Sequence, residues 1–495
     1  MSANEDTYRQ IIWKQFHKRI LGRIALYILI LFCLVGIYAP FLASSKPLFV
    51  NYDGVWYFPL FRYLFYRGFY TKGLDIFFNL LMFTAPLAIL AGYFLRRHTR
   101  ILFVTLLGIF AIQFALFLYF CFGPVLDPAS DSQLSRQQQQ ELVSHSLPDW
   151  NFDLKYMNDY KKFNLVLTYQ LQERQQQNLQ TYIGSRHLPT LWQQKRDNEE
   201  REIKRYQSEL ASSKPDSNEY QIAKASITYL EQRHQWIADQ SKLLTDEVMP
   251  LIRPFHWQDD AGGSQELNHL VPFWDQTRVN RTDLVAALIF GVRISLVVGI
   301  LSVSLALMIG LPIGAFAGFY GGKFDILMSR FLEVWEAMPT FFMLLMVVAI
   351  MQNKSIFLVI AIIGFFGWTS FSRYMRGEFF KQRNLPYVEA CRAIGFNDSY
   401  IIFSHILPNA IPPVLTLLPF AIMGAITSEA GLSFLGLGEE GSCSWGVLMD
   451  EGRSVFPGES GLLWPPAILL TILLVTIAIV GDTLRDALDP KMHRL

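Results

Sequence analysis

The chain has 495 residues, and its 43 lysines and arginines against 42 aspartates and glutamates leave a formal charge of only +1. This balance excludes nucleic-acid binding that depends on bulk positive charge. Hydrophobic residues make up 52% of the chain and charged residues 17%, below the roughly 25% typical of soluble domains. So much apolar surface cannot be buried in one aqueous core, and the composition therefore predicts an integral membrane protein.

Eight uncharged stretches are long enough, or nearly so, to cross a bilayer, which takes about 20 helical residues. They are residues 24–42, 76–95, 101–126, 294–322, 337–353, 355–372, 406–428 and 460–481. Five basic residues between Arg9 and Arg23 precede the first stretch, and no clear cleavage site follows it, so we interpret it as a retained signal anchor. An even number of spans, with basic residues clustered on one side, predicts a multi-pass protein of the cytoplasmic (inner) membrane with both termini in the cytoplasm.

The segment 127–286 is rich in glutamine and poor in long apolar runs, which predicts a water-facing insert on the extracytoplasmic side. We expect helices at 154–182 and 189–212, and a third along the stripe that runs from Tyr220 to Leu244. His234 lies in this stripe. Because no second ligand stands at a metal-binding spacing from it, we interpret His234 as a packing residue.

Motifs for catalysis and for nucleotide or metal binding are missing from the sequence. The nearest approach to a phosphate-binding loop, Gly321-Gly322-Lys323, continues with Phe324 instead of a hydroxyl residue. The cysteines Cys33, Cys121, Cys391 and Cys443 form no pairable set. The chain is therefore not expected to be an enzyme or to bind a cofactor, and no catalytic or metal-ligating residue is predicted.

A loop between two spans carries the most specific pattern. Pro386 favours a helix start, the small residues Ala390 and Ala393 allow another surface to approach closely, and Gly395 can adopt the left-handed conformation that ends a helix. The pattern predicts a short exposed helix over residues 387–395 that docks into a groove of a partner protein and moves with it.

This loop resembles the EAA coupling motif of binding-protein-dependent ABC importers, in which a membrane subunit presents a short helix to a separate ATPase. The residues that match the motif are Tyr387, Glu389, Ala390, Cys391, Ala393, Gly395, His405 and Pro408. Further matches to the C-type permease of the oligopeptide/dipeptide/nickel importers lie within 287–490, at 291–296, 318–325, 433–438, 444–446 and 481–490. Residues 51–59 and 331–340 resemble the Yej-type branch of that family, which is associated with oligopeptides and peptide conjugates.

The sequence departs from the family pattern in three places. The two spans between 76 and 126, together with the insert, are additional to the usual six-span plan. Residues 280–283 replace the usual Gly-Arg-Asp turn, and Cys391 stands in place of the second alanine of the motif. The last change exchanges one small residue for another.

The resemblance implies an all-α fold, that of the type I ABC importer transmembrane subunit with an α-helical extracytoplasmic insert. It implies alternating access without chemistry of the chain's own, with ATP and magnesium held by partner subunits. The implied partners are two ABC ATPase subunits, a second homologous permease, an extracytoplasmic peptide-binding protein and the lipid bilayer, without nucleic acid. The implied function is import of oligopeptides or peptide conjugates, with a dipeptide or nickel/metal-chelate importer as the alternative.

These inferences divide the chain into seven segments. They are 1–23 as the cytoplasmic N-terminus, 24–42 as the anchor helix, 43–75 as an aromatic-rich extracytoplasmic loop, 76–126 as two extra transmembrane helices, 127–286 as the insert, 287–486 as the permease domain and 487–495 as the cytoplasmic tail. Two side-chain roles stay open. Glu429 is either a helix-end carboxylate or a residue of the transport path, and the glycines between 310 and 322 either pack helices or contact substrate.

Two other classes of protein are less compatible with the sequence. A secondary transporter would favour internal repeats and paired charges within the membrane, which the sequence does not display convincingly. A membrane sensor that used the insert as its receptor would need a cytoplasmic output module, and only fourteen residues follow Gly481.

Overall fold

The structure is a computed structural model. It describes residues 8–43, 48–52, 54–58, 60–61, 64–65, 73–96, 98–123, 188–212, 215, 220, 223–224, 227–228, 231, 244–248, 250, 284–351, 355–439, 442–454 and 463–488. The helix expected at 154–182 and the side chain of His234 lie outside the described residues. Contacts divide the chain into two compact units, of which the first comprises Met1–Gly36 and Ala287–Leu495 and the second Ile37–Ala286.

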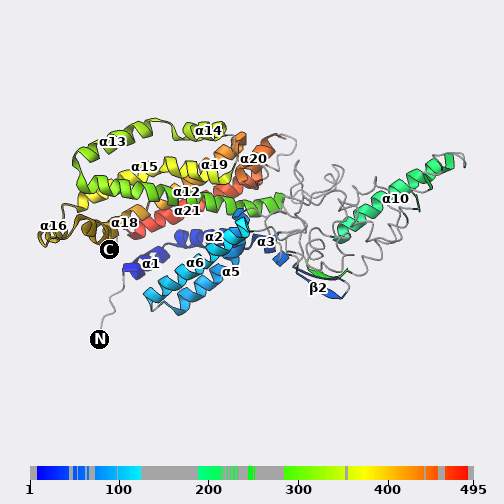
Figure 1. The fold of residues 1–495 in the computed structure, drawn as a ribbon, viewed down its shortest axis with the longest axis horizontal. Helices are drawn as coiled ribbons and strands as arrows, with labels where there is room; N and C mark the ends of the chain where they lie inside the picture. Colours follow the sequence, from blue (N-terminus) through cyan, green and yellow to red (C-terminus); the bar gives the residue numbers. More distant parts are fainter. Residues whose placement is uncertain are drawn as a thin grey trace. The chain divides into compact units, whose positions relative to one another are not determined.

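Among the described residues, seven helices are long and apolar enough to cross a membrane, or eight if one bent pair forms a single span. Each of the eight stretches predicted from the sequence overlaps one of these. The helices of the first unit are α1 (Tyr8–Lys18), α2 (Ile20–Ile37), α12 (Leu284–Tyr320), α13 (Gly322–Ala337), α14 (Thr340–Met351), α15 (Ile356–Gln382), α16 (Pro386–Ala393), α17 (Asp398–Tyr400), α18 (Leu407–Leu415), α19 (Leu418–Leu432), α20 (Trp445–Ser454) and α21 (Trp464–Leu488). Within this unit α1, α16 and the end of α21 lie at one end, and α14 and α20 at the other (Figure 1).

Helices α12 and α15 pack closely because one face of α12 carries glycines at every fourth position. A Cβ on Gly310 would lie 2.5 Å from the carbonyl oxygen of Trp368, and one on Gly314 would lie 2.2 Å from that of Ser372. A Cβ on Gly318 would lie 2.5 Å from the Arg376 oxygen. The backbones therefore meet directly, as in small-xxx-small membrane packing. These glycines serve helix packing, the first of the two roles considered above.

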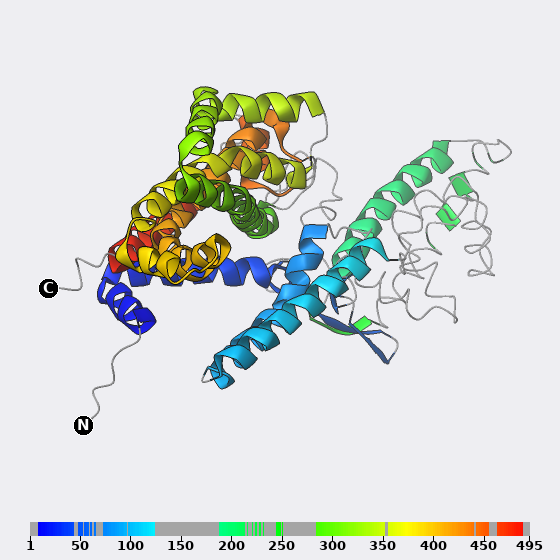
Figure 2. The same ribbon diagram turned by 60° about the vertical axis from the view of Figure 1, so that its left-hand side comes forward.

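The fifth predicted span, 337–353, is wrong as a straight helix. The chain instead forms α13 and α14, which meet at an angle of 73°. Figure 2 shows the two helices in lime green at this sharp angle. The break falls at Met338-Pro339, because proline disfavours the helical conformation of the residue before it. Helix α14 alone has 12 residues, too few to cross a bilayer.

The predicted span 406–428 is also interrupted. A π-helical turn over Ile401–Ile406 leads into α18, and a second break at Thr416 separates α18 from α19. Pro412 and Pro413 remove backbone donors from the end of α18, which explains why the helix stops there. Beyond α19 a π-helical segment, Ser433–Leu437, contains Gly436 with a φ of 80°.

The anchor helix α2 is fixed to the first unit at both of its ends. A Cβ on Gly22 would lie 2.4 Å from a methyl carbon of Thr483, so the backbone of α2 packs directly against a side chain of α21. At the other end the buried Arg293 donates from Nε to the carbonyl oxygen of Gly36 over 2.7 Å. Arg19 and Asp486 add an ion pair. The signal anchor therefore packs as an integral helix of this unit.

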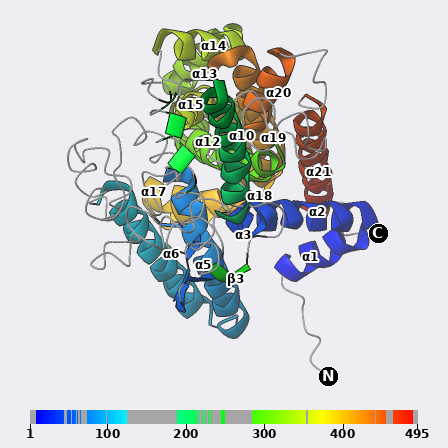
Figure 3. The same ribbon diagram turned by 90° about the vertical axis from the view of Figure 1, so that its right-hand side faces the viewer.

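The second unit contains a membrane hairpin of α5 (Gly73–Phe94) and α6 (Thr99–Phe122), which run side by side in Figures 1 and 3. Polar side chains of the hairpin form hydrogen bonds within the unit. Thr84 donates to Gln113 over 2.7 Å, and Asn79 donates to the carbonyl oxygen of Leu64 over 2.8 Å. Bonds of this kind hold helices together where no water is present to satisfy polar groups. The rest of α6 exposes apolar side chains, as a lipid-facing helix does.

A small antiparallel sheet in the second unit was not predicted. The segment 43–75, expected to be a loop, follows the short helix α3 (Ala39–Leu42) and contains the strands β1 (Phe49–Tyr52) and β2 (Val55–Tyr57). The third strand, β3 (Leu244–Val248), pairs with β1. Assigning Leu244 to a helix was therefore wrong, because a long-range strand pairing decides its conformation. Upstream, α10 (Leu188–Ser212) confirms the helix expected at 189–212.

Candidate functional site: the helix Pro386–Ala393

The predicted docking helix is present as α16, between the long helix α15 and the π-helical turn that precedes α18. Leu385 is its N-cap in an extended conformation, and Pro386 occupies the first helical position, where a missing N–H is harmless. Helix α15 ends at Gln382, so three residues make the sharp turn into α16. The chain therefore presents α16 as a separate element beyond the end of a span.

A Schellman motif ends α16. The N–H of Gly395 donates to the carbonyl oxygen of Arg392 over 3.0 Å, and that of Phe396 donates to the oxygen of Cys391 over 3.1 Å. Gly395 has a φ of 90°, the left-handed conformation that the sequence predicted for it. Both hydrogen bonds depend on this conformation, so one glycine fixes where the helix stops and the direction in which the chain leaves.

The surface of α16 divides into an inner and an outer face. Val388 and Cys391 are buried, while Glu389, Ala390 and Ala393 are exposed. Further apolar side chains are exposed just beyond the helix, at Ile394 (72%), Phe396 (42%) and Phe403 (59%). These six residues, Glu389, Ala390, Ala393, Ile394, Phe396 and Phe403, are called the docking residues below. Exposed apolar side chains that gather outside the membrane-spanning helices are typical of surfaces that bind another protein.

Tyr387 attaches the inner face of α16 to the end of α15. Its hydroxyl donates to Oε1 of Gln382 over 2.7 Å. Burial raises the pKa of Tyr387 above its ordinary value, and a hydrogen bond with Asn409 opposes that shift. Tyr387 is therefore a structural contact between three segments and is not part of the exposed surface.

His405 and Pro408 lie on the returning segment. The His405 ring stacks on Phe396 at 6.2 Å between centroids and meets Tyr400 edge-on at 5.3 Å. Its backbone oxygen accepts a hydrogen bond from Asn409 over 2.8 Å. Pro408 is exposed in the first turn of α18. The motif residues therefore gather around α16, and His405 supports the chain that leaves the Gly395 cap.

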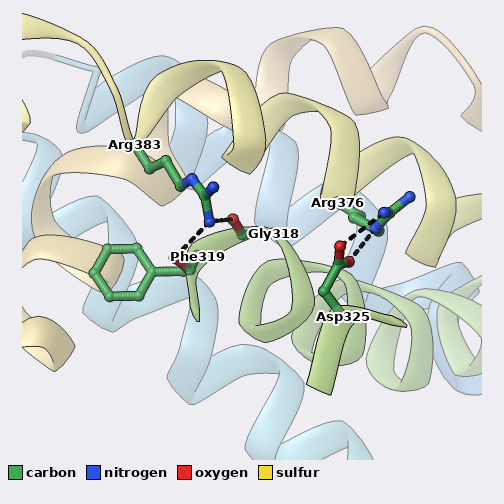
Figure 4. A network of polar contacts seen from close by, with 5 residues as sticks. All are labelled: Gly318, Phe319, Asp325, Arg376 and Arg383. Carbon is green, nitrogen blue, oxygen red and sulfur yellow. Dashed lines mark hydrogen bonds and ion pairs between the residues drawn. The ribbon is translucent and has the colours of Figure 1, made fainter. Parts of the chain in front are cut away.

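Two arginines connect α15 to α12 and α13. Arg376 lies in α15, and Arg383 directly follows it. Arg383 donates from one guanidinium nitrogen to the carbonyl oxygens of Gly318 and Phe319, at 3.2 and 3.3 Å (Figure 4). It thereby caps the C-terminal turn of α12, where unpaired carbonyls favour a cation. Arg376 forms a two-pronged ion pair with Asp325 of α13, one contact of which measures 2.9 Å. Sequence reasoning counted these arginines only as cytoplasmic charge and missed both contacts.

A third contact connects α16 itself with α12. The guanidinium carbon of Arg392 lies 5.4 Å from the centre of the Phe319 ring, within cation–π distance. Phe319 is buried, and the turn that follows α12 uses Gly321 and Gly322 at φ values of 64° and 62°. The end of α12 is therefore in contact with α16 through Arg392 and with the α15 end through Arg383.

Glu429 lies away from α16 and is a buried helix-end carboxylate. It is 1% exposed, and its Oε1 accepts hydrogen bonds from Ser433 over 2.7 Å and Ser444 over 2.6 Å. Ser444 also accepts a bond from the N–H of Gly446 and directly precedes α20. Of the two roles considered for Glu429, the structure supports the structural one. In the described part of the chain, no group of three or more His, Cys, Asp and Glu side chains is placed to hold a metal ion.

Comparison with known proteins identifies the family on these elements. The model of the binding-protein-dependent transport system inner membrane component matches residues 310–494, which include α16 and its neighbours. The model of the N-terminal transmembrane domain of oligopeptide transport permease C matches residues 7–58, from α1 to β2. Among solved structures, an inward-facing MetNI methionine ABC transporter chain is similar at 18% identity, with a TM-score of 0.34 and coverage of 41% of this chain and 96% of its own.

Curated relatives match the same part of the chain. The inner membrane ABC transporter permease protein YejE of Escherichia coli (strain K12) is 37% identical over 44% of this chain and 64% of its own length. The peptidoglycan transport system permease protein YejE of Agrobacterium fabrum is 36% identical, and the match spans 57% of that protein. The oligopeptide transport system permease protein OppC of Haemophilus influenzae is 37% identical over 49% of this chain and 79% of its own. The chain thus spans less than two thirds of the two YejE proteins but most of OppC, and it belongs to the binding-protein-dependent ABC transporter permease family, among the relatives of oligopeptide permease C.

Proposed function

We propose that this chain is a membrane-spanning permease subunit of an ATP-driven, binding-protein-dependent importer of oligopeptides or peptide conjugates. The names of its relatives support this substrate class, since they are permeases for oligopeptides, peptidoglycan and glutathione. The observation that carries the proposal is α16, a short capped helix that exposes the docking residues beyond the end of a span. The chain's own role is mechanical, and ATP and magnesium are held by the partner ATPases.

In this mechanism α16 sits in a groove of an ATPase subunit. When two ATPases close on ATP, each moves the helix that it holds, and the movement favours one arrangement of the membrane helices over the other. The Arg392–Phe319 contact and the Arg383 hydrogen bonds transmit this movement to α12, and the Arg376–Asp325 pair transmits it to α13. ATP binds the closed ATPase pair more tightly than the open pair. The difference between these two binding free energies sets how far ATP shifts the equilibrium between the two arrangements of the membrane helices.

The orientation follows from which elements share an end of the first unit. Helices α1 and α16 and the end of α21 lie together (Figure 1), and Arg19 pairs with Asp486 between the two terminal segments. We place this end in the cytoplasm of a cell with this chain in its inner membrane, because that is where the ATPases and the basic residues belong. A second homologous permease completes the pore, and an extracytoplasmic peptide-binding protein delivers substrate at the opposite face.

Reconstitution of the complete transporter tests the proposal. Proteoliposomes that contain this chain, its companion permease and the ATPases, with binding protein outside, should accumulate labelled oligopeptide only when ATP is enclosed with the ATPases. Omitting the ATPases should abolish uptake, and this chain purified alone should hydrolyse no ATP. Uptake that proceeds equally without ATPases or ATP would identify a secondary transporter and would refute the proposal.

A further inference from the structure

The first unit contains a cavity that no part of the coupling mechanism uses. It has a volume of about 420 Å³ and lies between α12, α14, α15 and α19. Its wall is built from apolar and small residues together with hydroxyl side chains, and none of the lining residues carries a charge. The small residues Gly367 and Gly424 are exposed, so the cavity opens to the surface. Small residues that elsewhere bring helices together here leave a space between them.

Four hydroxyls line the cavity, and three of them lack protein partners. Ser302 donates to the carbonyl oxygen of Ile360 over 3.2 Å. The hydroxyls of Thr340, Ser370 and Ser428 make no hydrogen bond to any residue within the described part of the chain. They stand on α14, α15 and α19 respectively, so three helices each direct one polar group to the same space.

Neighbouring hydroxyls in the same helices behave differently. Thr427, next to Ser428 in α19, donates to the carbonyl oxygen of Met423 over 2.8 Å, and Ser304 of α12 donates to that of Ile300 over 2.7 Å. Such bonds to the preceding turn are how serine and threonine satisfy themselves inside membranes. Thr340 and Ser370 are exposed and Ser428 is half-buried, so the hydroxyls around the cavity are accessible to water and to any occupant that can form hydrogen bonds.

We propose that this cavity binds a segment of the peptide in transit, an inference that rests on the peptide-importer function proposed above. The peptide's main-chain amides bond to the hydroxyls of Thr340, Ser370 and Ser428, while an uncharged side chain packs on the apolar wall. An apolar cavity of about 150 Å³ holds a benzene ring, so 420 Å³ accommodates an aromatic side chain together with its main-chain groups. A lipid acyl chain is the poorer occupant because it leaves the hydroxyls unpaired.

Two glycines allow the cavity to be filled without pushing the helices apart. A Cβ on Gly424 meets no atom within 4 Å, and a Cβ on Gly367 meets only the Cβ of Ala306 at 3.8 Å, an ordinary contact. Leucine at either position therefore extends into the cavity. Gly377 is the matched control, because it also lies in α15, also has open space around it and does not line the cavity. The variants are Gly424→Leu, Gly367→Leu and Gly377→Leu.

Uptake by the complete transporter in proteoliposomes is measured for trialanine and for the bulkiest uncharged tripeptide that the wild-type transporter accepts. We expect the Gly424→Leu and Gly367→Leu variants to lose at least tenfold in uptake of the bulky peptide and less than twofold for trialanine. The Gly377→Leu variant should transport both peptides like the wild type. Unchanged uptake of both peptides by the cavity variants, or an equal loss of both, would overturn the inference. If the wild-type transporter takes up no peptide at all, the proposed function itself fails.

Labelling distinguishes a peptide from a lipid in the cavity. A Ser428→Cys variant of the complete transporter is labelled with a maleimide, and the labelling rate of the wild-type chain is subtracted as background. The remaining rate should fall at least fivefold when trialanine is bound. Of the four native cysteines, Cys121, Cys391 and Cys443 are buried and Cys33 is half-buried, and the wild-type chain measures the background that they give. A labelling rate that changes with the acyl chains of the liposome but not with peptide would identify a lipid site and would overturn the inference.

Discussion

Replacing Gly395 tests the coupling helix at the single residue that fixes its end. Valine, asparagine and glutamine at this position form a graded series, because asparagine tolerates the left-handed conformation and a β-branched residue resists it. Gly395 has a φ of 90°, and a Cβ built on it meets no atom within 4 Å. Any defect within the subunit therefore comes from backbone strain and not from a steric clash with another part of the chain.

The magnitude follows from the two ways in which the chain can accommodate valine. Keeping the cap holds a non-glycine residue in the left-handed region at a cost of about 1–3 kcal/mol. Opening the cap gives up the bonds from Gly395 and Phe396 to Arg392 and Cys391, at about 0.5–1.5 kcal/mol each. The two routes have similar costs, so valine cannot avoid a loss of about 1–3 kcal/mol. If the ATPase binds only the capped helix, its affinity falls by roughly 5- to 150-fold.

The assay is the affinity of the ATPase for the purified permease pair, with peptide uptake as the functional readout. We expect the order glycine, asparagine, glutamine and valine in both measurements. Gly377→Val is the control, since Gly377 has open space around it but lies at an ordinary helical position of α15. A Gly395→Val variant that binds ATPase with wild-type affinity at normal membrane abundance would refute the reasoning.

Three further predictions concern the surroundings of Gly395. Glu389→Ala should leave the thermal stability of the isolated subunit unchanged, because Glu389 is exposed. The same variant should weaken ATPase binding by about 2–5 kcal/mol if the carboxylate pairs with a buried basic group of the ATPase. Binding within twofold of wild type would contradict this pairing. Arg383→Ala should lower the unfolding free energy by about 1.5–3 kcal/mol, since it removes the guanidinium that caps the carbonyl oxygens of Gly318 and Phe319. Arg383→Lys should recover part of this loss, and thermal unfolding of the two variants measures both effects. Burial raises the pKa of Tyr387, so the hydroxyl keeps its proton to a higher pH in the folded state than in the unfolded state. The resulting contribution to stability is complete below the ordinary tyrosine pKa of about 10. It is lost as the pH rises through the pKa of Tyr387 in the folded state. A Tyr387→Phe variant should lack this alkaline component when unfolding is compared between pH 8 and 11, and identical curves for the two proteins would contradict the assignment.

Local sequence signals were sufficient for the long helices and for α16. Apolar length located the spans that are single unbroken helices, such as α6 and α21, since about 20 consecutive apolar residues are what a helix needs to cross a bilayer. The end of α16 was predictable for an equally local reason, because Gly395 follows a helical pattern at the position where a left-handed residue is needed. The small residues Ala390 and Ala393 were likewise found exposed, as expected of a docking surface.

Long-range contacts were beyond the reach of these signals. Leu244 continued a helical stripe in the sequence, yet it pairs with Tyr52 in the sheet, almost two hundred positions earlier. The bend between α13 and α14 and the break at Thr416 interrupt apolar runs that hydropathy reads as continuous. Arg383 looked like one more cytoplasmic charge. Its role as a cap on α12 depends on a helix that ends more than sixty residues earlier.

Cross-linking from α16 tests the central claim most directly. The photoreactive residue p-benzoylphenylalanine is placed at Ala393, among the docking residues, and in a separate variant at Phe342, an exposed residue of α14 at the other end of the unit (Figure 1). After illumination of the assembled transporter, Ala393 should cross-link to the ATPase subunit with a yield that changes when ATP is bound, and Phe342 should not cross-link to it. Absence of an ATPase adduct from Ala393, in complexes that contain the ATPase in full amount, would contradict the account.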